Sequence, residues 1–341
     1  MRNVLLMLGM MVVAVSCSSA PGGSEATPKA TLRPAAKVVF PHETDCNSPA
    51  WWAGGQLHIL NSAGHPWLSV GKDLFTLANP RKIEYDNTVN GGRWIEAVWQ
   101  AGDVLYGYYH NEPGGLAPGT TLTAPKIGAA KSTDNGRTWK DLGIIMEADP
   151  ATFKLDAKNG YFIGGHGDFC VYLDPEEKYL YIYYGSYGGD VSEQGVAVAR
   201  MKWEDRDEPV EKVWKWHQGK WSEPGLRGKL SPIWPGFVAW EREDCNAFWG
   251  PSIHWNTYLK CYVMLLNRSK AKGWVQDGIY VSFAEELGDV KAWSKPVKIL
   301  EGGAWYPQVM GLEAGGTDKL AGKVARFFMA GVSEREVVFG K

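Results

Sequence analysis

Five times along the chain, a pair of apolar or alternating segments surrounds a short turn that contains Gly, Asp or Asn. Such a pair predicts two antiparallel β-strands. After four of the pairs comes a second recurring pattern, a strand followed by a polar turn and then by Trp or Leu near a Pro or Gly. Units made of one pair and one such pattern begin near residues 47, 94, 168, 247 and 305. Five irregular repeats of this kind predict a five-bladed β-propeller, in which each blade is a four-stranded sheet.

The last of these units is short. We therefore expect the strand at residues 38–40, near the N-terminus, to complete it and to close the ring. Helical patterning is almost absent, and 17 Trp, 15 Tyr and 41 Gly are typical of short packed strands joined by turns. The fold class is therefore predicted to be all-β. A β-sandwich also contains many short strands, but it does not predict the recurring second pattern.

The N-terminus has the features of an export signal. Arg2 precedes an apolar run from Val4 to Val15, which is too short to span a bilayer as a mature helix. The run ends at Ser16 and Cys17, and this arrangement resembles a bacterial lipoprotein signal peptide in which Cys17 is lipidated. An ordinary secretory signal that is cleaved nearby is the alternative, and both interpretations imply export.

Residues 18–36 are rich in Ser, Pro, Ala and Gly, so we expect a flexible tether between a signal peptide at residues 1–17 and the folded domain. Residues 37–341 are predicted to form one propeller domain in the bacterial cell envelope, in the periplasm or on the outer-membrane surface. The lipid would be its only contact with the membrane. The net charge is −2 and no basic stripe is present, which argues against nucleic acid as a partner.

Four further cysteines follow Cys17: Cys46, Cys170, Cys245 and Cys261. They show neither a Cys-x-x-Cys pair nor a spacing typical of zinc sites. In an oxidising compartment they suit either two disulfide bonds or buried free thiols, and the sequence leaves both open. No cofactor and no catalytic metal are expected.

The segment STDNGRTW at residues 132–139 matches the Asp-box pattern Ser-x-Asp-x-Gly-x-Thr-Trp at every fixed position. Ser132 and Asp134 suit hydrogen bonds to turn amides, and Gly136 supplies a positive φ. Trp139 is expected to fill the space between strands. The motif is similar to the Asp boxes of sialidases and of many other propellers, which lie on outer turns away from the substrate. It therefore predicts the fold rather than the ligand.

The segment GDFCVYLDPEEKYLYIYYGS resembles the blade of glycoside hydrolase family 43 and its relatives in which an Asp opens the innermost strand. The resemblance implies a glycosidase that acts on an oligo- or polysaccharide. It places Asp168 on the family's second catalytic Asp, which orients the acid and tunes its pKa. The family's base Asp normally precedes a Pro, whereas here Ser48 precedes Pro49 and Asp45 lies three residues before Ser48. Asp45 is therefore a displaced match.

The third motif of that family, Glu-Gly-Pro, carries its general acid. In this chain the matching phrase is FWGPSIHW, so Trp249 occupies the glutamate position. Glu243, just before that strand, and Glu96, in the second repeat, are the carboxylates expected to substitute. Glycosidic hydrolysis requires one protonated carboxyl and one ionised carboxyl. We therefore expect Asp45, Asp168 and one of Glu96 or Glu243 to meet at the channel mouth.

Aromatic and basic side chains near the predicted channel mouth are candidates for substrate binding. Sugar rings stack on flat aromatic surfaces, and Arg pairs with carboxylated sugars. The candidates are Trp51, Arg93, Trp94, His166, Arg242, Trp249, Trp305 and Tyr306. The strand histidines His110, His166 and His254 are also candidates for an acid or base, or for lining a central structural cation site.

Three other functions remain open. A non-catalytic glycan-binding lipoprotein would explain the missing glutamate at Trp249. A polysaccharide lyase would need a base such as His166. A sialidase would need three arginines around one carboxylate, and only Arg93 and Arg242 are well placed, with Arg268 as a poor third.

Overall fold

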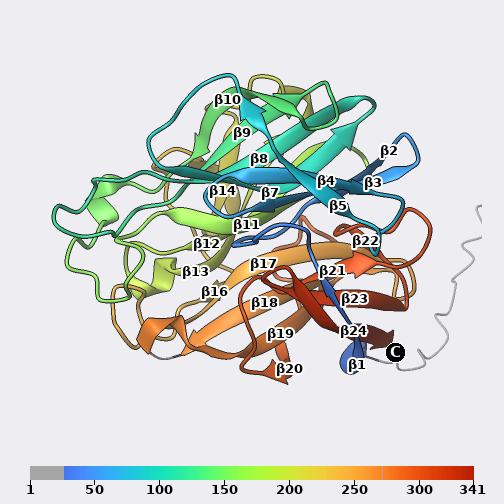
Figure 1. The fold of residues 1–341 in the computed structure, drawn as a ribbon. Helices are drawn as coiled ribbons and strands as arrows, with labels where there is room; N and C mark the ends of the chain where they lie inside the picture. Colours follow the sequence, from blue (N-terminus) through green and yellow to red (C-terminus); the bar gives the residue numbers. More distant parts are fainter. Residues whose placement is uncertain (1–26, 271) are drawn as a thin grey trace, which may run out of the picture.

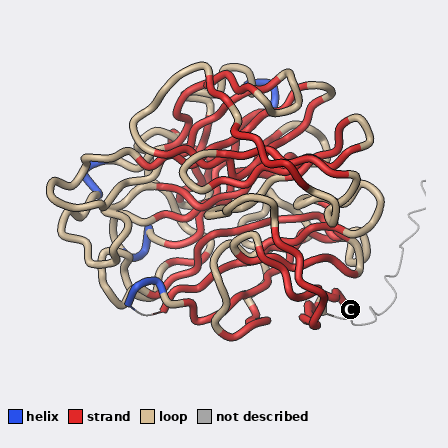
Figure 2. Tube along the Cα trace, in the orientation of Figure 1, coloured by secondary structure: helices blue, strands red, loops and turns tan. Residues whose placement is uncertain are grey.

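The computed structural model describes residues 27–270 and 272–341, and these residues form five antiparallel sheets. Figures 1 and 2 show strands throughout the molecule and only short helical turns. The fold is a five-bladed β-propeller, as the repeats predict. The predicted signal peptide, including Cys17, and the tether up to residue 26 lie outside the described residues.

The first two blades follow the predicted strand pairs. Blade I contains, from the axis outward, β2 (Ala50–Ala53), β3 (Gln56–Ser62), β4 (Pro66–Gly71) and β5 (Ala78–Lys82). Blade II contains β7 (Gly92–Ala101), β8 (Val104–Glu112), β9 (Lys126–Ser132) and β10 (Thr138–Met146). The short β6 (Glu84–Tyr85) joins the outer edge of blade II in parallel with β10.

Blades III and IV carry additional strands. Blade III contains β11 (His166–Leu173), β12 (Tyr179–Ser186), β13 (Gly195–Lys202), β14 (Val213–His217) and β15 (Lys220–Pro224), and β16 (Trp234–Pro235) pairs with β13. Blade IV contains β17 (Asn246–Asn256), β18 (Cys261–Lys270), β19 (Gln276–Ala284) and β20 (Val297–Glu301), with β22 (Leu320–Ala321) parallel to β17.

Blade V joins the two ends of the chain. It contains β21 (Gln308–Gly311), β23 (Val324–Met329), β24 (Val332–Gly340) and β1 (Lys29–Val39). The expected closing strand is present, but it is longer than residues 38–40. Residues 29–36 were assigned to the flexible tether, and this boundary is wrong because they pair with β24 from Lys29↔Gly340 to Pro34↔Arg335. A strand at the edge of a sheet is held by backbone hydrogen bonds, so it can form even where, as in residues 18–36, few large apolar residues are present.

The hydrophobic core lies between neighbouring blades. Separate clusters of buried side chains join blades I and II, II and III, III and IV, IV and V, and V and I. The last of these includes Phe40, which stacks on Phe328 with ring centroids 4.1 Å apart. Because every blade packs on both neighbours, the ring is closed.

The Asp box at residues 132–139 has a structural role away from the axis. In the turn between β9 and β10, Asp134 accepts hydrogen bonds from the amides of Arg137 and Thr138 at 3.1 and 3.0 Å. Trp139 is buried there, and its indole donates to the carbonyl of Gly136.

Cys46, Cys170, Cys245 and Cys261 are buried free thiols. Within residues 27–270 and 272–341, no helix has the length and apolar character needed to cross a membrane.

Candidate active site

Three of the innermost strands depart from regular pairing at the same end of the axis. The register skips between Ile95 and Ala97 in β7, between Gly167 and Cys170 in β11, and between Trp249 and Ser252 in β17. Such bulges redirect side chains and are common beside functional sites. The residues left out of the regular strand pairing are Glu96, Asp168 with Phe169, and Gly250 with Pro251.

Asp168 occupies the β11 bulge with a left-handed backbone, at φ +45°. This conformation is unfavourable for a residue other than Gly and persists where surrounding contacts enforce it. Its side chain is 2% exposed. The hydroxyl of Tyr187 donates a short hydrogen bond to one carboxylate oxygen, and that of Tyr306 donates to the other at 3.1 Å. Tyr306 also has a positive φ, of 57°.

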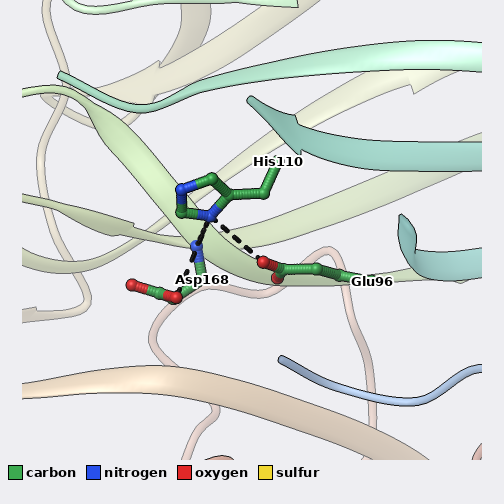
Figure 3. A group of neighbouring side chains, drawn as sticks. All are labelled: Glu96, His110 and Asp168. Carbon is green, nitrogen blue, oxygen red and sulfur yellow. Dashed lines mark hydrogen bonds and ion pairs between the residues drawn. The ribbon is translucent and has the colours of Figure 1, made fainter. Parts of the chain in front are cut away.

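Glu96, on blade II, binds the backbone of the same bulge. Its Oε2 accepts a hydrogen bond from the backbone amide of Phe169 at 2.7 Å, an amide that the bulge removes from the sheet. Its Oε1 lies 3.1 Å from Nδ1 of His110. Figure 3 shows Glu96 directed at the His110 ring, and the backbone nitrogen and carboxylate of Asp168 beside the same ring nitrogen. Glu96 therefore lies at the axis, as expected, but beneath the surface.

His110 is surrounded by carboxylates. Besides Glu96, Glu112 lies 3.2 Å from its Nε2 and Asp168 Oδ1 lies 3.9 Å from its Nδ1. Burial lowers the pKa of this imidazole, but the hydrogen bonds and charges of the three carboxyl groups outweigh burial and raise its pKa well above the usual value. The raised pKa favours a proton on the imidazole of His110, whose Nδ1 also lies 3.2 Å from the backbone amide of Asp168.

The pKa values of the buried carboxyl groups are also raised, which favours their neutral forms. Burial raises the pKa of Asp168 to about 7, although the charge of His110 and the Tyr187 hydroxyl act to lower it. Burial also raises the pKa of Glu96 above its ordinary value. The protonation of the His110 imidazole therefore depends on that of the neighbouring carboxyl groups, and theirs depends on His110.

Glu96, His110 and Asp168 are also the one group in the described residues with suitable ligand atoms for a metal, since these atoms lie within 4.8 Å of one another. A metal would need the neutral imidazole. The raised pKa of His110 opposes this, and the imidazolium already supplies a positive charge to both carboxyls. In the structure these residues form an internal ion-pair network, and a structural cation at this place stays a prediction.

Asp45 is the exposed carboxyl of this region. Partial burial raises the pKa of Asp45 to about 6, with a further increase from the charge of Glu112 and an opposing effect of His110. Asp45 thus interacts electrostatically with the network but, unlike Asp168, is accessible to solvent. Glu112 is also accessible, because its side chain is 32% exposed.

An aromatic cluster covers Asp168. It contains Phe162, Tyr187, Trp240, Trp249, Trp274 and Tyr306, with Trp305 at its edge. Trp249, in the position of the expected acid, is fully buried and packs edge-on against Tyr306 at 5.5 Å. Trp305 is partly exposed, and Tyr161 beside it is 38% exposed. Tyr161 and Trp305 are therefore the accessible aromatic rings of this cluster.

Asn47 connects blade I to the axis. Its side-chain amide donates to the carbonyls of Phe169 at 3.1 Å and Pro251 at 2.9 Å, in blades III and IV. Together with Glu96 it lines a cavity of about 10 Å³, which is room for a single water. The central channel is thus filled below the site.

The predicted substrate contacts of Arg93 and Trp51 are wrong because both side chains are buried, whereas that of Arg242 stays a prediction. Arg93 is buried and binds Asn87 and Asp141 while its guanidinium lies 3.6 Å from the ring centroid of Tyr85. Arg242 is exposed, but it is paired with Asp244 at 2.7 Å.

The third of these residues, Trp51, is 3% exposed and packs between blades I and II, against His58.

The remaining candidates are distributed as follows. Trp94 packs edge-on against His110 at 5.6 Å, next to the network. His166 is buried, and its Nε2 lies 3.0 Å from Nζ of the buried Lys215. Glu243 is exposed in the loop before β17, and its catalytic role stays a prediction.

Sequence reasoning missed Glu112, Tyr161 and Tyr187 as parts of the site. One signal does point to Glu112. His110 and Glu112 are two residues apart at the end of a strand, so their side chains lie on the same face. Tyr187 directly follows β12 and Tyr161 lies in a loop, and neither position carries a local pattern.

The fold and the site define a five-bladed propeller with carboxyl groups at one mouth of its axis, and solved structures of this class are similar to the chain. The endo-arabinase of Bacteroides thetaiotaomicron is 8% identical, with a TM-score of 0.52 over 88% of this chain and 96% of that one. An exo-β-1,3-galactanase from Phanerochaete chrysosporium, solved with β-1,3-galactotriose, is 11% identical, with a TM-score of 0.50 over 89% of this chain.

The chain spans 64% of the length of that galactanase. No family model and no curated protein matches the sequence. The predicted resemblance to propeller glycoside hydrolases is therefore confirmed at the level of fold, and it is distant.

Proposed function

We propose that this protein is a glycoside hydrolase that acts on an oligo- or polysaccharide at the channel mouth around Asp45. The observation that carries the proposal is an exposed carboxyl with a pKa of about 6, electrostatically coupled to the buried network of Glu96, His110 and Asp168. A carboxyl with a raised pKa is the usual form of a general acid in glycosidases.

The second carboxyl is assigned to Glu112. Its carboxyl lies 3.2 Å from Nε2 of His110, and its partial exposure leaves it accessible to water or to a sugar. Asp45 and Glu112 would then supply the two carboxyl groups that the reaction needs. Tyr161 and Trp305 offer rings on which a sugar can stack. Asp168 positions the network instead of touching the substrate, because it is covered by aromatic side chains.

The test is sugar release by the protein and by Asp45→Asn, measured by chromatography on arabinan, β-1,3-galactan and a panel of other glycans. We expect Asp45→Asn to lose at least about 100-fold in rate while the thermal midpoint is unchanged, since the residue is exposed. Glu43→Gln is the matched control, because Glu43 is an exposed acid two residues away and should keep nearly full activity. Equal rates for the protein and Asp45→Asn would refute the assignment.

A second candidate is glycan binding without catalysis. It is favoured by one observation, the buried Trp249 in the position of the expected acid. This candidate predicts that the protein binds a glycan, that Tyr161→Ala weakens binding, and that no product forms from any substrate. That combination of results would exclude the hydrolase.

The lyase and sialidase alternatives have less support. The candidate lyase base His166 is buried, and the neighbouring Lys215 and burial together keep its pKa well below the usual value. For a sialidase, Arg93 is engaged with Asp141 and Arg268 binds Asn246, so neither is free to bind a carboxylate.

The proposal includes export as a lipoprotein anchored through Cys17. It is supported by the charged start, the apolar run and the small residues before the cysteine. Radiolabelled palmitate should be incorporated in bacteria that express the full chain and not in those that express Cys17→Ser. Equal labelling of both would contradict the lipid anchor.

A further inference from the structure

A groove whose lining does not include Asp45 lies beside the turn between β9 and β10. It has a volume of about 680 Å³, within the range of ligand-binding pockets. Outer strands of blade I form one wall and the turn at residues 134–138 forms the other. The groove also includes Ala53 and Gly54, at the opposite end of β2 from the mouth near Asp45.

Three exposed cations line this groove: Arg81, Lys82 and Arg137. Within residues 27–270 and 272–341, none of their charged groups forms an ion pair or a hydrogen bond with another side chain. By contrast, Arg33, Arg93, Arg227 and Arg242 each pair with a carboxylate. Three unpaired cations from two chain segments therefore converge on one concavity.

The other polar groups of the groove add mainly hydrogen-bond donors. Asn79, Asn135 and Gln56 are exposed, and their side-chain amides have no partner within the described part of the chain. Two acids are present. Asp134 is occupied by the hydrogen bonds of its own turn, which lower its pKa. Glu84 is exposed and is the one carboxylate free to oppose an anion there.

We propose that this groove is a second binding site, for a glycan that carries carboxylate or sulfate groups. Guanidinium and ammonium groups bind both anions, and the amide donors suit sugar hydroxyls. The anionic chemistry follows from the groove itself, whereas the choice of a glycan rests on the proposed function. Such a site would hold the protein on an acidic polysaccharide while the mouth near Asp45 acts independently.

The test is binding of the full chain to polygalacturonate, which carries carboxylates, and to dextran sulfate, measured by affinity electrophoresis and titration calorimetry. The triple variant Arg81→Gln, Lys82→Gln, Arg137→Gln should bind about tenfold or more weakly, because charge-assisted hydrogen bonds are lost. The two polymers distinguish carboxylate from sulfate as the recognised group, and binding of either one supports the site.

Glu84→Gln should have the opposite effect and strengthen binding, since it removes the opposing charge. The control for the triple variant is Lys212→Gln, Lys220→Gln, Lys295→Gln, three exposed lysines outside this groove that lose the same total charge. We expect this control to bind like the unmodified protein. Raising the salt concentration should weaken binding of the unmodified protein and leave the triple variant little changed.

The proposal is overturned if both triple variants bind equally, or if the protein binds duplex DNA or phosphatidylglycerol vesicles as tightly as the acidic glycans. Asp45→Asn separates this site from the proposed hydrolase. It should retain binding at the groove, so a failure of catalysis and a failure of groove binding are distinguishable results.

Discussion

At the scale of single residues, Asp168 shows how burial and hydrogen bonding oppose each other. Its carboxyl is buried at a strained backbone position, and two tyrosine hydroxyls and one imidazolium compensate for the lost water. Each of these partners favours the ionised form, whereas burial favours the neutral one. A carboxyl in this situation is sensitive to the loss of any one donor.

Tyr187→Phe tests this sensitivity. It removes one donor from a buried carboxyl and should lower the free energy of unfolding by about 1 to 3 kcal/mol, measured by urea denaturation. Tyr184→Phe is the matched control, because the Tyr184 hydroxyl is equally buried and has no hydrogen-bond partner within the described residues. We expect that control to stay within about 0.5 kcal/mol of the unmodified protein. Similar losses for both variants would contradict the role of Tyr187.

The raised pKa of Asp168 predicts a pH dependence of stability. Since its pKa is about 7 when folded and 3.8 as the reference, the folded state holds the proton more tightly. The stability that this contributes is complete below pH 3.8 and is lost as the pH rises through 7.

The measurement is the free energy of unfolding of the protein and of Asp168→Asn at several pH values from about 5 to 8. Relative to the variant, the unmodified protein should lose roughly 1 kcal/mol or more across this range. Comparing the two proteins at each pH cancels the titration of the groups that do not interact with Asp168. A constant difference would show that the pKa of Asp168 is not raised.

At the scale of the elements, bulges in the innermost strands build the site. Each bulge directs a residue at the axis and leaves backbone groups unpaired, and side chains from other blades satisfy them. Glu96 binds the Phe169 amide, and Asn47 binds the Phe169 carbonyl. The same side chains therefore form the site and connect neighbouring blades.

The strand β1 also permits a test. A chain that begins at residue 40 lacks β1 and exposes the edge of β24, whereas a chain that begins at residue 27 retains it. We expect the shorter chain to melt several degrees lower and to associate through the open edge. Most β1 side chains are exposed or half-buried, so the loss should be moderate. Thermal unfolding and size-exclusion chromatography measure both effects, and identical behaviour would show that β1 contributes no stability.

At the scale of the whole molecule, packing between blades and a few polar contacts at the axis hold the ring together. Asn47→Ala would leave the carbonyls of Phe169 and Pro251 unpaired in a nearly filled channel. We expect a loss of about 2 to 4 kcal/mol in the free energy of unfolding, measured by urea denaturation. A loss below about 0.5 kcal/mol would mean that water replaces the amide without cost.

The sequence alone determined the number of blades, their starting positions and the closing role of an N-terminal strand. These follow from local patterns, because strand alternation and turn residues are encoded within a few positions. It also placed Asp168 and Glu96 at the axis, since both open predicted strands. The predicted end of the tether at residue 36 was wrong. Residues 29–34 pair with β24 through backbone hydrogen bonds, which do not require particular residue types.

Only the tertiary structure decided which carboxyls are accessible. Whether Asp45 faces water, Asp168 is covered by Tyr187 and Tyr306, or Arg93 binds Asp141 depends on side chains from different blades. Burial and charge at such a point are sums over neighbours that are distant in the chain. A local pattern therefore predicts where a carboxyl lies along a strand, while its proton affinity and exposure are set by the assembled ring.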